Sequence, residues 1–173
     1  MRQRAYAFVT LVVLLSSSLL FAQKSGVQVQ PEDKLEKLLP ATVFLDGENI
    51  PTQKRNAVLI DVDGKKAILT LVDTSGYSSA YQQKYAGVIL TQGELKLGSK
   101  TLAPGAYGFG ETKTGDHDTA KVTIHVYDLG GKEVGQVATE RAADMKGVRP
   151  LQVIAENGSA QFYLGPNHVA IGK

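Results

Sequence analysis

Three short segments carry residue types that could do chemistry or bind a ligand, and the first is Asp73-Thr74-Ser75-Gly76. This loop follows an apolar run at residues 67–72, so the sequence predicts that Asp73 lies at the end of a buried strand. A carboxylate there could act as an acid or a base if a second carboxylate shared its proton. We favour the simpler interpretation, in which Asp73 accepts hydrogen bonds from amides further along its own turn.

The same loop resembles the active-site loop of the aspartic peptidases, in which an apolar strand runs into Asp-Thr-Gly. The resemblance implies that Asp73 is catalytic and that Thr74 supports the loop. It also implies a homodimer, because the chain contains the motif once and the pair needs two aspartates. Ser75 stands where the family has glycine, which departs from the family's tight loop. A dimeric aspartic peptidase is therefore the alternative hypothesis.

The second segment, residues 76–85, contains Tyr77, Tyr81 and Tyr85 at intervals of four residues. This spacing places the three rings near one face of a helix, and also on one face of a strand. A rigid ring with a polar tip suits stacking on a sugar or a peptide, so we predict these tyrosines as ligand-binding residues. The alternative is that the rings pack over a sheet edge with their hydroxyl groups in water.

The third segment is the Gly-rich aromatic run at residues 102–110. Tyr107 and Phe109 point to the same face of a strand, and we predict them as a second, weaker binding patch. Gly108 and Gly110 leave the opposite face bare, which admits either a ligand or another part of the backbone. Packing is the more common reason for such a bare face.

The histidines do not predict a metal site. His117 lies between Asp116 and Asp118, in a loop without the ligand spacing of calcium loops. His125 follows eight residues later, too far along an extended chain to share an ion with His117, and no spacing relates either to His168. Phosphate-binding loops, dinucleotide fingerprints and hydrolase motifs are absent from the sequence. We therefore expect no metal and no cofactor.

The first 22 residues have the pattern of a signal peptide. Two arginines precede an apolar stretch at residues 5–22, and Ala22 offers a small residue before a cleavage site at Gln23. The sequence thus predicts a secreted or periplasmic protein with no membrane span after cleavage. The alternative is a retained anchor, since 18 residues is at the short end of what crosses a bilayer.

The remaining composition narrows the class of protein. Of 173 residues, 43% are hydrophobic, which favours one globular domain and excludes disorder throughout. The net charge of +2 comes from the two leader arginines, and without them 17 basic residues balance 17 acidic residues. We therefore expect no nucleic-acid partner. The chain contains no cysteine, so it has no disulfide.

Short β-branched runs separated by Gly, Asn, Asp and Pro predict an all-β domain at residues 41–173. The strongest hairpin signal is Asp63-Gly64 between two apolar runs. We expect an antiparallel sandwich or small barrel of about nine or ten short strands, with one or two short helices. Residues 23–40 read as a linker with a short helical segment, and later helical candidates are residues 78–84 and 139–145.

The runs LVDTSGYSSAYQQKY (71–85) and LAPGAYGFG (102–110) are similar to those of uncharacterised short exported bacterial proteins. This resemblance implies a signal peptide and one β-rich domain, and supplies no activity, cofactor or catalytic residue. The sequence therefore predicts an exported, non-catalytic β-domain. Its expected role is binding a small molecule, a glycan or a protein, or docking at the cell envelope.

Overall fold

A computed structural model describes residues 26–115, 121–143, 149–156 and 159–173, and it confirms an all-β fold with short helices. The described residues form fourteen strands and two helices. That is more than the nine or ten strands expected, because four of them are only two or three residues long. All the strand pairs are antiparallel, as the short connections between them require.

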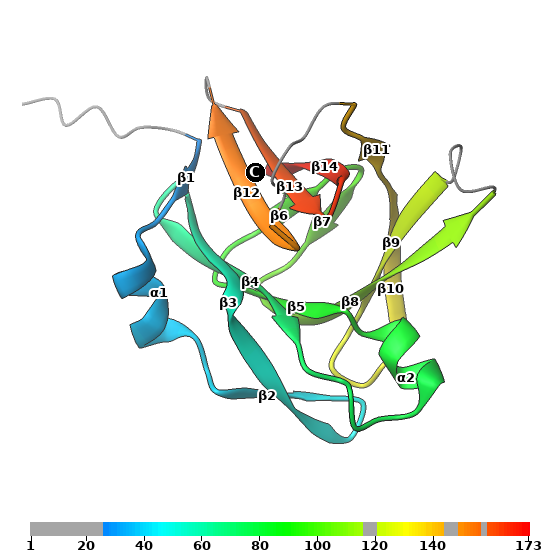
Figure 1. Ribbon diagram of the computed structural model, residues 1–173. Helices are drawn as coiled ribbons and strands as arrows, with labels where there is room; N and C mark the ends of the chain where they lie inside the picture. Colours follow the sequence, from blue (N-terminus) through cyan, green and yellow to red (C-terminus); the bar gives the residue numbers. More distant parts are fainter. Residues whose placement is uncertain (1–25, 116–120, 144–148, 157–158) are drawn as a thin grey trace, which may run out of the picture.

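The larger sheet has eight strands and curves beneath the smaller one (Figure 1). Its order is β1-β3-β4-β5-β8-β9-β10, and β2 pairs with β3. The strands are β1 (Val27–Val29), β2 (Thr42–Leu45), β3 (Glu48–Val62), β4 (Lys65–Val72), β5 (Gly87–Thr91), β8 (Gly105–Thr114), β9 (Lys121–Tyr127) and β10 (Glu133–Ala138). Residues 27–29, which the sequence assigned to a linker, thus supply an edge strand.

The smaller sheet has six strands in the order β12-β13-β14-β6-β7, with β11 paired to β14. The strands are β6 (Leu95–Leu97), β7 (Lys100–Leu102), β11 (Glu140–Arg141), β12 (Leu151–Glu156), β13 (Ser159–Leu164) and β14 (Asn167–Gly172). Strand β12 contacts β1 and β3 at one edge, and β7 contacts β10 at the other. The two sheets therefore enclose a core in the manner of a half-barrel.

Two Asp-Gly turns close the hairpins on either side of β3. Asp46 and Gly47 have φ values of 51° and 86°, and Asp63 and Gly64 have 50° and 81°. Both are two-residue turns of the primed type, which confirms the hairpin predicted at Asp63-Gly64. The register of β3 against β4 shifts between Thr52 and Ala57. This irregularity lets the first half of β3 leave the barrel and pair with β2.

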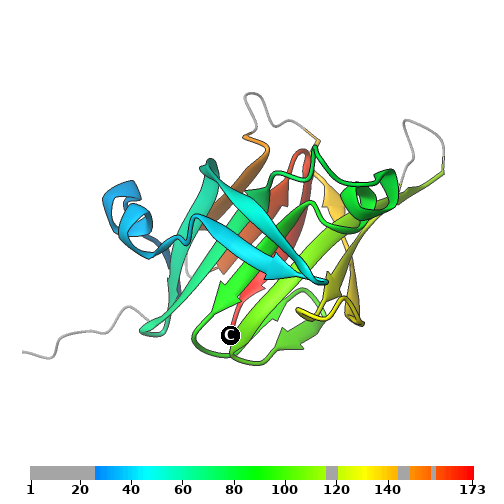
Figure 2. The same cartoon turned by 90° about the horizontal axis from the view of Figure 1, so that it is seen from below.

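Both faces of the larger sheet are covered, so its central strands are apolar on both sides. In β4, Ala67 and Leu69 belong to the main core between the sheets, whereas Ile68 packs on the outer face. Phe109 and Phe162 meet edge to face across the main core, with ring centroids 5.8 Å apart. Figure 2 shows the β2–β3 hairpin lying across the outer face of the larger sheet, with a helix on each side.

The two helices cover the outer face where the sequence expected helical segments. Helix α1 (Glu32–Leu38) packs Leu35 against β3 and β4. Helix α2 (Ser79–Lys84) begins after Ser78, whose hydroxyl group accepts a hydrogen bond from the backbone N–H of Tyr81 at 3.3 Å. Neither helix of the described chain is long and apolar enough to cross a membrane.

The helix predicted over residues 139–145 is wrong over the part that the structure describes. Glu140 and Arg141 form strand β11 and pair with His168 and Asn167 of β14. The helix propensity of this stretch is overridden because its backbone N–H and C=O groups form hydrogen bonds with the open edge of β14.

Candidate functional site

Asp73 occupies a turn on the surface, as the simpler interpretation expected. Its Oδ1 atom accepts hydrogen bonds from the Ser75 backbone N–H at 3.1 Å and from the Ser75 hydroxyl group at 2.7 Å. These hydrogen bonds hold the pKa of the Asp73 carboxyl below its ordinary value. This geometry is that of a turn at Asp73. The carbonyl oxygen of Thr74 continues the turn by accepting a hydrogen bond from the Tyr77 backbone N–H at 3.0 Å.

The predicted tyrosines form one continuous column on the outer face of the larger sheet. The rings of Tyr77 and Tyr81 stack with centroids 4.9 Å apart, and Tyr81 and Tyr85 are 4.8 Å apart. Tyr127, which the sequence analysis did not single out, extends the column at 5.5 Å from Tyr85 in an edge-on arrangement. The spacing of four residues thus correctly predicted that the three tyrosines lie together. Tyr127, from strand β9, adds a fourth ring to the column.

The hydroxyl groups of the column bind the β2–β3 hairpin. Tyr81 donates to the carbonyl oxygen of Leu45 at 2.7 Å, and Tyr77 donates to that of Asn49 at 3.3 Å. Burial raises the pKa of Tyr81 to about 12. Tyr85 is fully buried. The polar tips are therefore engaged within the chain, and the column fastens α2 to the hairpin.

A single ion pair closes the end of this column. Lys84 Nζ lies 2.8 Å from Asp46 Oδ2. The same atom lies 5.1 Å from the ring centroid of Tyr85 and 5.2 Å from that of Tyr127. The hydrogen bond from Lys84 lowers the pKa of Asp46. Cation and rings are within the range of cation–π attraction. The ammonium group therefore joins the turn of the hairpin to the end of α2.

Both residues of the second predicted patch face the main core from β8. Phe109 is fully buried in the main core, and Tyr107 packs against the same core while donating to the carbonyl oxygen of Ala103 at 2.9 Å. On the other face, a Cβ atom at Gly108 would lie 2.6 Å from the ring of Tyr85, and one at Gly110 would meet the backbone of α2. The bare face therefore admits α2 rather than a ligand.

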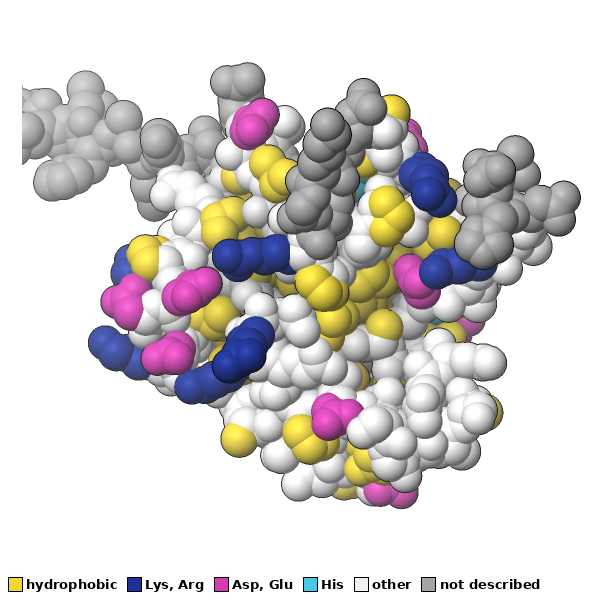
Figure 3. Space-filling model, viewed as in Figure 1, with side chains coloured by type: hydrophobic (Ala, Val, Ile, Leu, Met, Phe, Trp, Pro, Cys, Tyr) yellow, Lys and Arg dark blue, Asp and Glu magenta, His cyan; other side chains and the backbone are white. Residues whose placement is uncertain are grey.

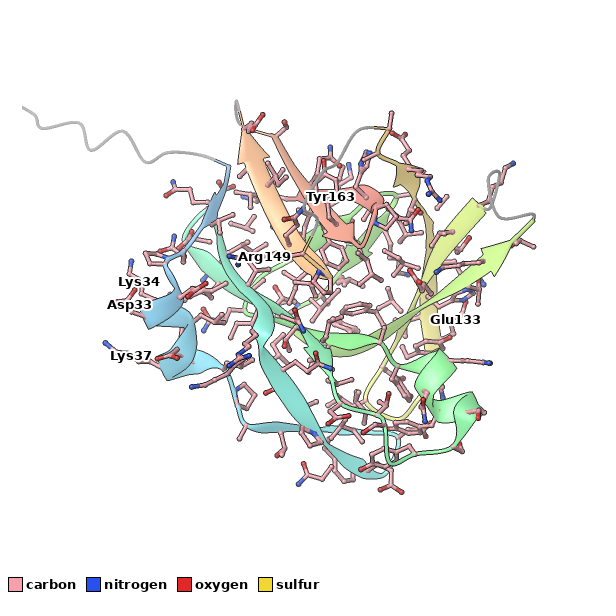
Figure 4. The ribbon with its side chains drawn as sticks, in the orientation of Figure 1. Asp33, Lys34, Lys37, Glu133, Arg149 and Tyr163 are labelled. Atoms are coloured by element: carbon pink, nitrogen blue, oxygen red, sulfur yellow. The ribbon has the colours of Figure 1, made fainter. Side chains whose placement is uncertain are left out.

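A hydrogen-bonded trio that no sequence motif predicted lies on the outer face of β8, β9 and β10. His125 Nε2 lies 2.9 Å from Thr112 Oγ1, and His125 Nδ1 lies 3.1 Å from Glu133 Oε2. Glu133 is on β10, at the far side of the molecule from α1 (Figure 4). Hydrogen bonds from Gln136 and from His125 lower the pKa of Glu133.

The trio has the order of a hydroxyl nucleophile, a base and an orienting carboxylate. Chemistry would also require a recess for a substrate and donors for an oxyanion. None of the principal cavities of the described chain is lined by Thr112, His125 or Glu133. We therefore assign the trio to cross-strand pairing on the sheet surface.

A cavity lies at the mouth of the half-barrel, and none of the predicted site residues lines it. It has a volume of about 620 Å³ and opens between the larger sheet and the turn joining β13 to β14. Its apolar walls come from β4, β9, the loop before β5 and the β13–β14 hairpin, and include Leu71, Ala86, Val122 and Leu164. Figure 3 shows hydrophobic side chains gathered in a hollow on this face, with charged side chains along one border.

The polar residues of this mouth cavity come from both sheets. Gln53 is held in place, since its Nε2 atom donates to the carbonyl oxygen of Val72 at 2.9 Å and its Oε1 atom accepts from Asn56. Glu111 and Lys113 pair with each other at 3.1 Å. Arg141 and Asn167 complete the rim. A mostly apolar recess with a few polar groups is the usual form of a small-molecule site.

The mouth cavity brings together residues that are more than 100 positions apart in sequence, so periodicity could not have revealed it. His117 and the neighbouring acidic loop fall outside the described residues, as does the turn at residues 157–158. Within the described ranges, no three His, Asp or Glu side chains are grouped so that they could hold a metal ion. Comparison with protein-family models, with curated proteins and with solved structures finds no match for the chain.

Proposed function

We propose that the chain is an exported, non-catalytic β-domain that binds a small apolar molecule in the mouth cavity. The observation that carries the proposal is the cavity itself, whose volume of about 620 Å³ lies within the range of small-molecule sites. The signal-peptide pattern of residues 1–22 supports the proposal of export to the periplasm or to the outside of the cell. The tyrosine column then has a structural role and holds the outer face together.

Binding is tested with the uncharged apolar dye N-phenyl-1-naphthylamine, whose fluorescence rises in apolar surroundings. The full chain is expressed with its own leader and purified from the exported fraction. We expect saturable binding with one site per chain. Mass spectrometry of the same material reports cleavage, and a mature chain that begins at Gln23 is the expected form.

Two cavity variants and one control locate the dye. Ala86→Phe places a bulky ring in the cavity, and Leu71→Gln makes its wall polar at similar volume, so both should weaken dye binding. Phe44→Ser removes an exposed aromatic ring, 60% accessible, that does not line the cavity, and it should leave binding unchanged. Circular dichroism confirms that each variant is folded. Binding that disappears with Phe44→Ser and survives both cavity variants contradicts the proposal.

A further inference from the structure

Among the residues that the structure describes, one positive charge lining the mouth cavity has no ion-pair partner. Three ionisable side chains line it, and two of them, Glu111 and Lys113, neutralise each other at 3.1 Å. The third is Arg141, whose exposed guanidinium group makes no hydrogen bond or ion pair with the described part of the chain. An arginine at the edge of an apolar recess is suited to a planar anion, because its donors form a rigid fork.

Strand pairing places an amide directly beside this cation. Arg141 of β11 lies opposite Asn167 of β14 in the antiparallel register. Residues directly opposite each other share one face of a sheet, with Cβ atoms about 4.5–5.5 Å apart. Asn167, Val169 and Ile171 alternate along β14 as buried residues, so this shared face is the inner one. Both side chains therefore belong to the cavity side of the sheet.

Asn167 is a buried polar residue without a side-chain partner. Only 6% of its surface is accessible, yet its carboxamide makes no hydrogen bond within the described ranges. No fully inaccessible side-chain nitrogen or oxygen atom in those ranges lacks a partner, so the carboxamide must reach the open space of the cavity. A buried amide is normally hydrogen-bonded, and one that is free in a cavity is poised to donate to a ligand.

We propose that Arg141 and Asn167 form an anion-binding end of the mouth cavity, and that its ligand is an amphipathic carboxylate. The hydrocarbon body would lie on the apolar walls, and the carboxylate group would accept hydrogen bonds from the guanidinium and amide groups. One uncompensated cation matches a monoanion better than a phosphate monoester, which carries a charge of about −1.5 to −2. This inference rests on the proposed binding function and specifies its ligand class.

Displacement of the neutral dye separates charge recognition from apolar binding. The competitors are decanoate, decanol, decylamine and decyl phosphate, which have chains of the same length and differ in the head group. We expect decanoate to displace the dye at a concentration about tenfold lower than decanol, since a charge-assisted hydrogen bond contributes at least that factor. Decylamine should be the weakest competitor.

Three variants test whether Arg141 and Asn167 cause the preference for decanoate over decanol. Arg141→Gln and Asn167→Leu should each reduce the advantage of decanoate over decanol while the dye still binds. Arg149→Gln should retain it, because Arg149 lies at the start of β12 near Glu32 of α1, 3.8 Å away and outside the cavity (Figure 4). Arg141 is exposed, so its replacement tests the inference even if the buried Asn167 variant does not fold.

The outcomes distinguish the two proposals. If the dye fails to bind the wild-type chain, the binding function itself is wrong. If the dye binds and decanoate and decanol compete equally, only the anion-binding end is wrong. Preference for decyl phosphate over decanoate overturns the carboxylate assignment. An advantage of decanoate that persists in Arg141→Gln overturns the role of the pair.

Discussion

Replacing Gly108 by alanine tests whether the tyrosine column is a rigid structural element. The new Cβ atom would lie 2.6 and 2.7 Å from two ring carbons of Tyr85 and 3.3 Å from Leu45 Cδ2. Carbon atoms pack best about 3.5–4.0 Å apart, so the ring would have to move by about 1 Å. Tyr85 is fully buried between Tyr81 and Tyr127, and it has no free space to move into.

The magnitude follows from two opposing effects. Overpacking of a well-packed core costs about 1–3 kcal/mol. Replacing glycine in a strand recovers about 0.5–1 kcal/mol of backbone entropy. The difference spans about 0–2.5 kcal/mol. Its midpoint predicts that the free energy of unfolding of Gly108→Ala falls by about 1 kcal/mol, which lowers Tm by about 2–4 °C in a domain of this size.

Urea unfolding followed by far-ultraviolet circular dichroism measures the loss, with an unchanged m-value expected. Gly76→Ala is the matched control, because a Cβ atom there meets nothing within 4 Å and the residue is not in the left-handed region. The free energy of unfolding of Gly76→Ala should be unchanged or higher by up to about 1 kcal/mol. Equal stability of the two variants would refute the view that Tyr85 fills the space above Gly108.

Three further predictions concern charged and polar groups on the outer face. Because the pKa of Tyr81 is raised to about 12 from an unfolded value near 10, its stabilisation is complete below pH 10 and is lost as the pH rises toward 12. Unfolding midpoints at about pH 9 and pH 11.5 should therefore differ less in Tyr81→Phe than in wild type. Asp46→Asn loses the ion pair with Lys84, but asparagine tolerates the positive φ of this position. In urea unfolding it should therefore destabilise the chain less than Asp46→Ala, which loses the ion pair and also strains the backbone. The pKa of Asp73 is lowered in the folded chain, so its stabilisation is present above about pH 4 and is lost as the pH falls through the folded pKa. The free energy of unfolding, measured in urea, should therefore fall less between about pH 5 and pH 2 in Asp73→Asn than in wild type. Acid proteolysis that is abolished by Asp73→Asn would favour the peptidase instead.

Local chemistry made parts of this fold predictable from sequence. The Asp63-Gly64 turn needs two positive φ values that few other residue pairs adopt, and the structure has them. The spacing of Tyr77, Tyr81 and Tyr85 predicted that their rings would come together, although it did not say that a hairpin would cover them. Local patterns report which side chains share a face, and they do not report what packs on it.

The candidate site depends on long-range pairing, which the sequence pattern does not encode. Glu140 and Arg141 lie among good helix formers, so the prediction of a helix concealed the strand that brings Arg141 beside Asn167. These two residues are 26 positions apart in sequence and lie on different strands, β11 and β14. Their approach is decided by which strand edge remains open for β11, and that is a property of the completed sheet.

The tyrosine column also determines what can be observed by optical spectroscopy. The chain has no tryptophan, so its near-ultraviolet emission comes from tyrosines. Six of its seven tyrosines follow residue 22, and four of these six are packed together in the column, Tyr77, Tyr81, Tyr85 and Tyr127. Intrinsic fluorescence will therefore report mainly on the docking of α2 against the hairpin. A molecule that enters the mouth cavity will change the intrinsic tyrosine fluorescence very little, since the larger sheet separates it from the rings of the column. Loss of tyrosine ellipticity before loss of far-ultraviolet signal would identify release of α2 as the first step of unfolding.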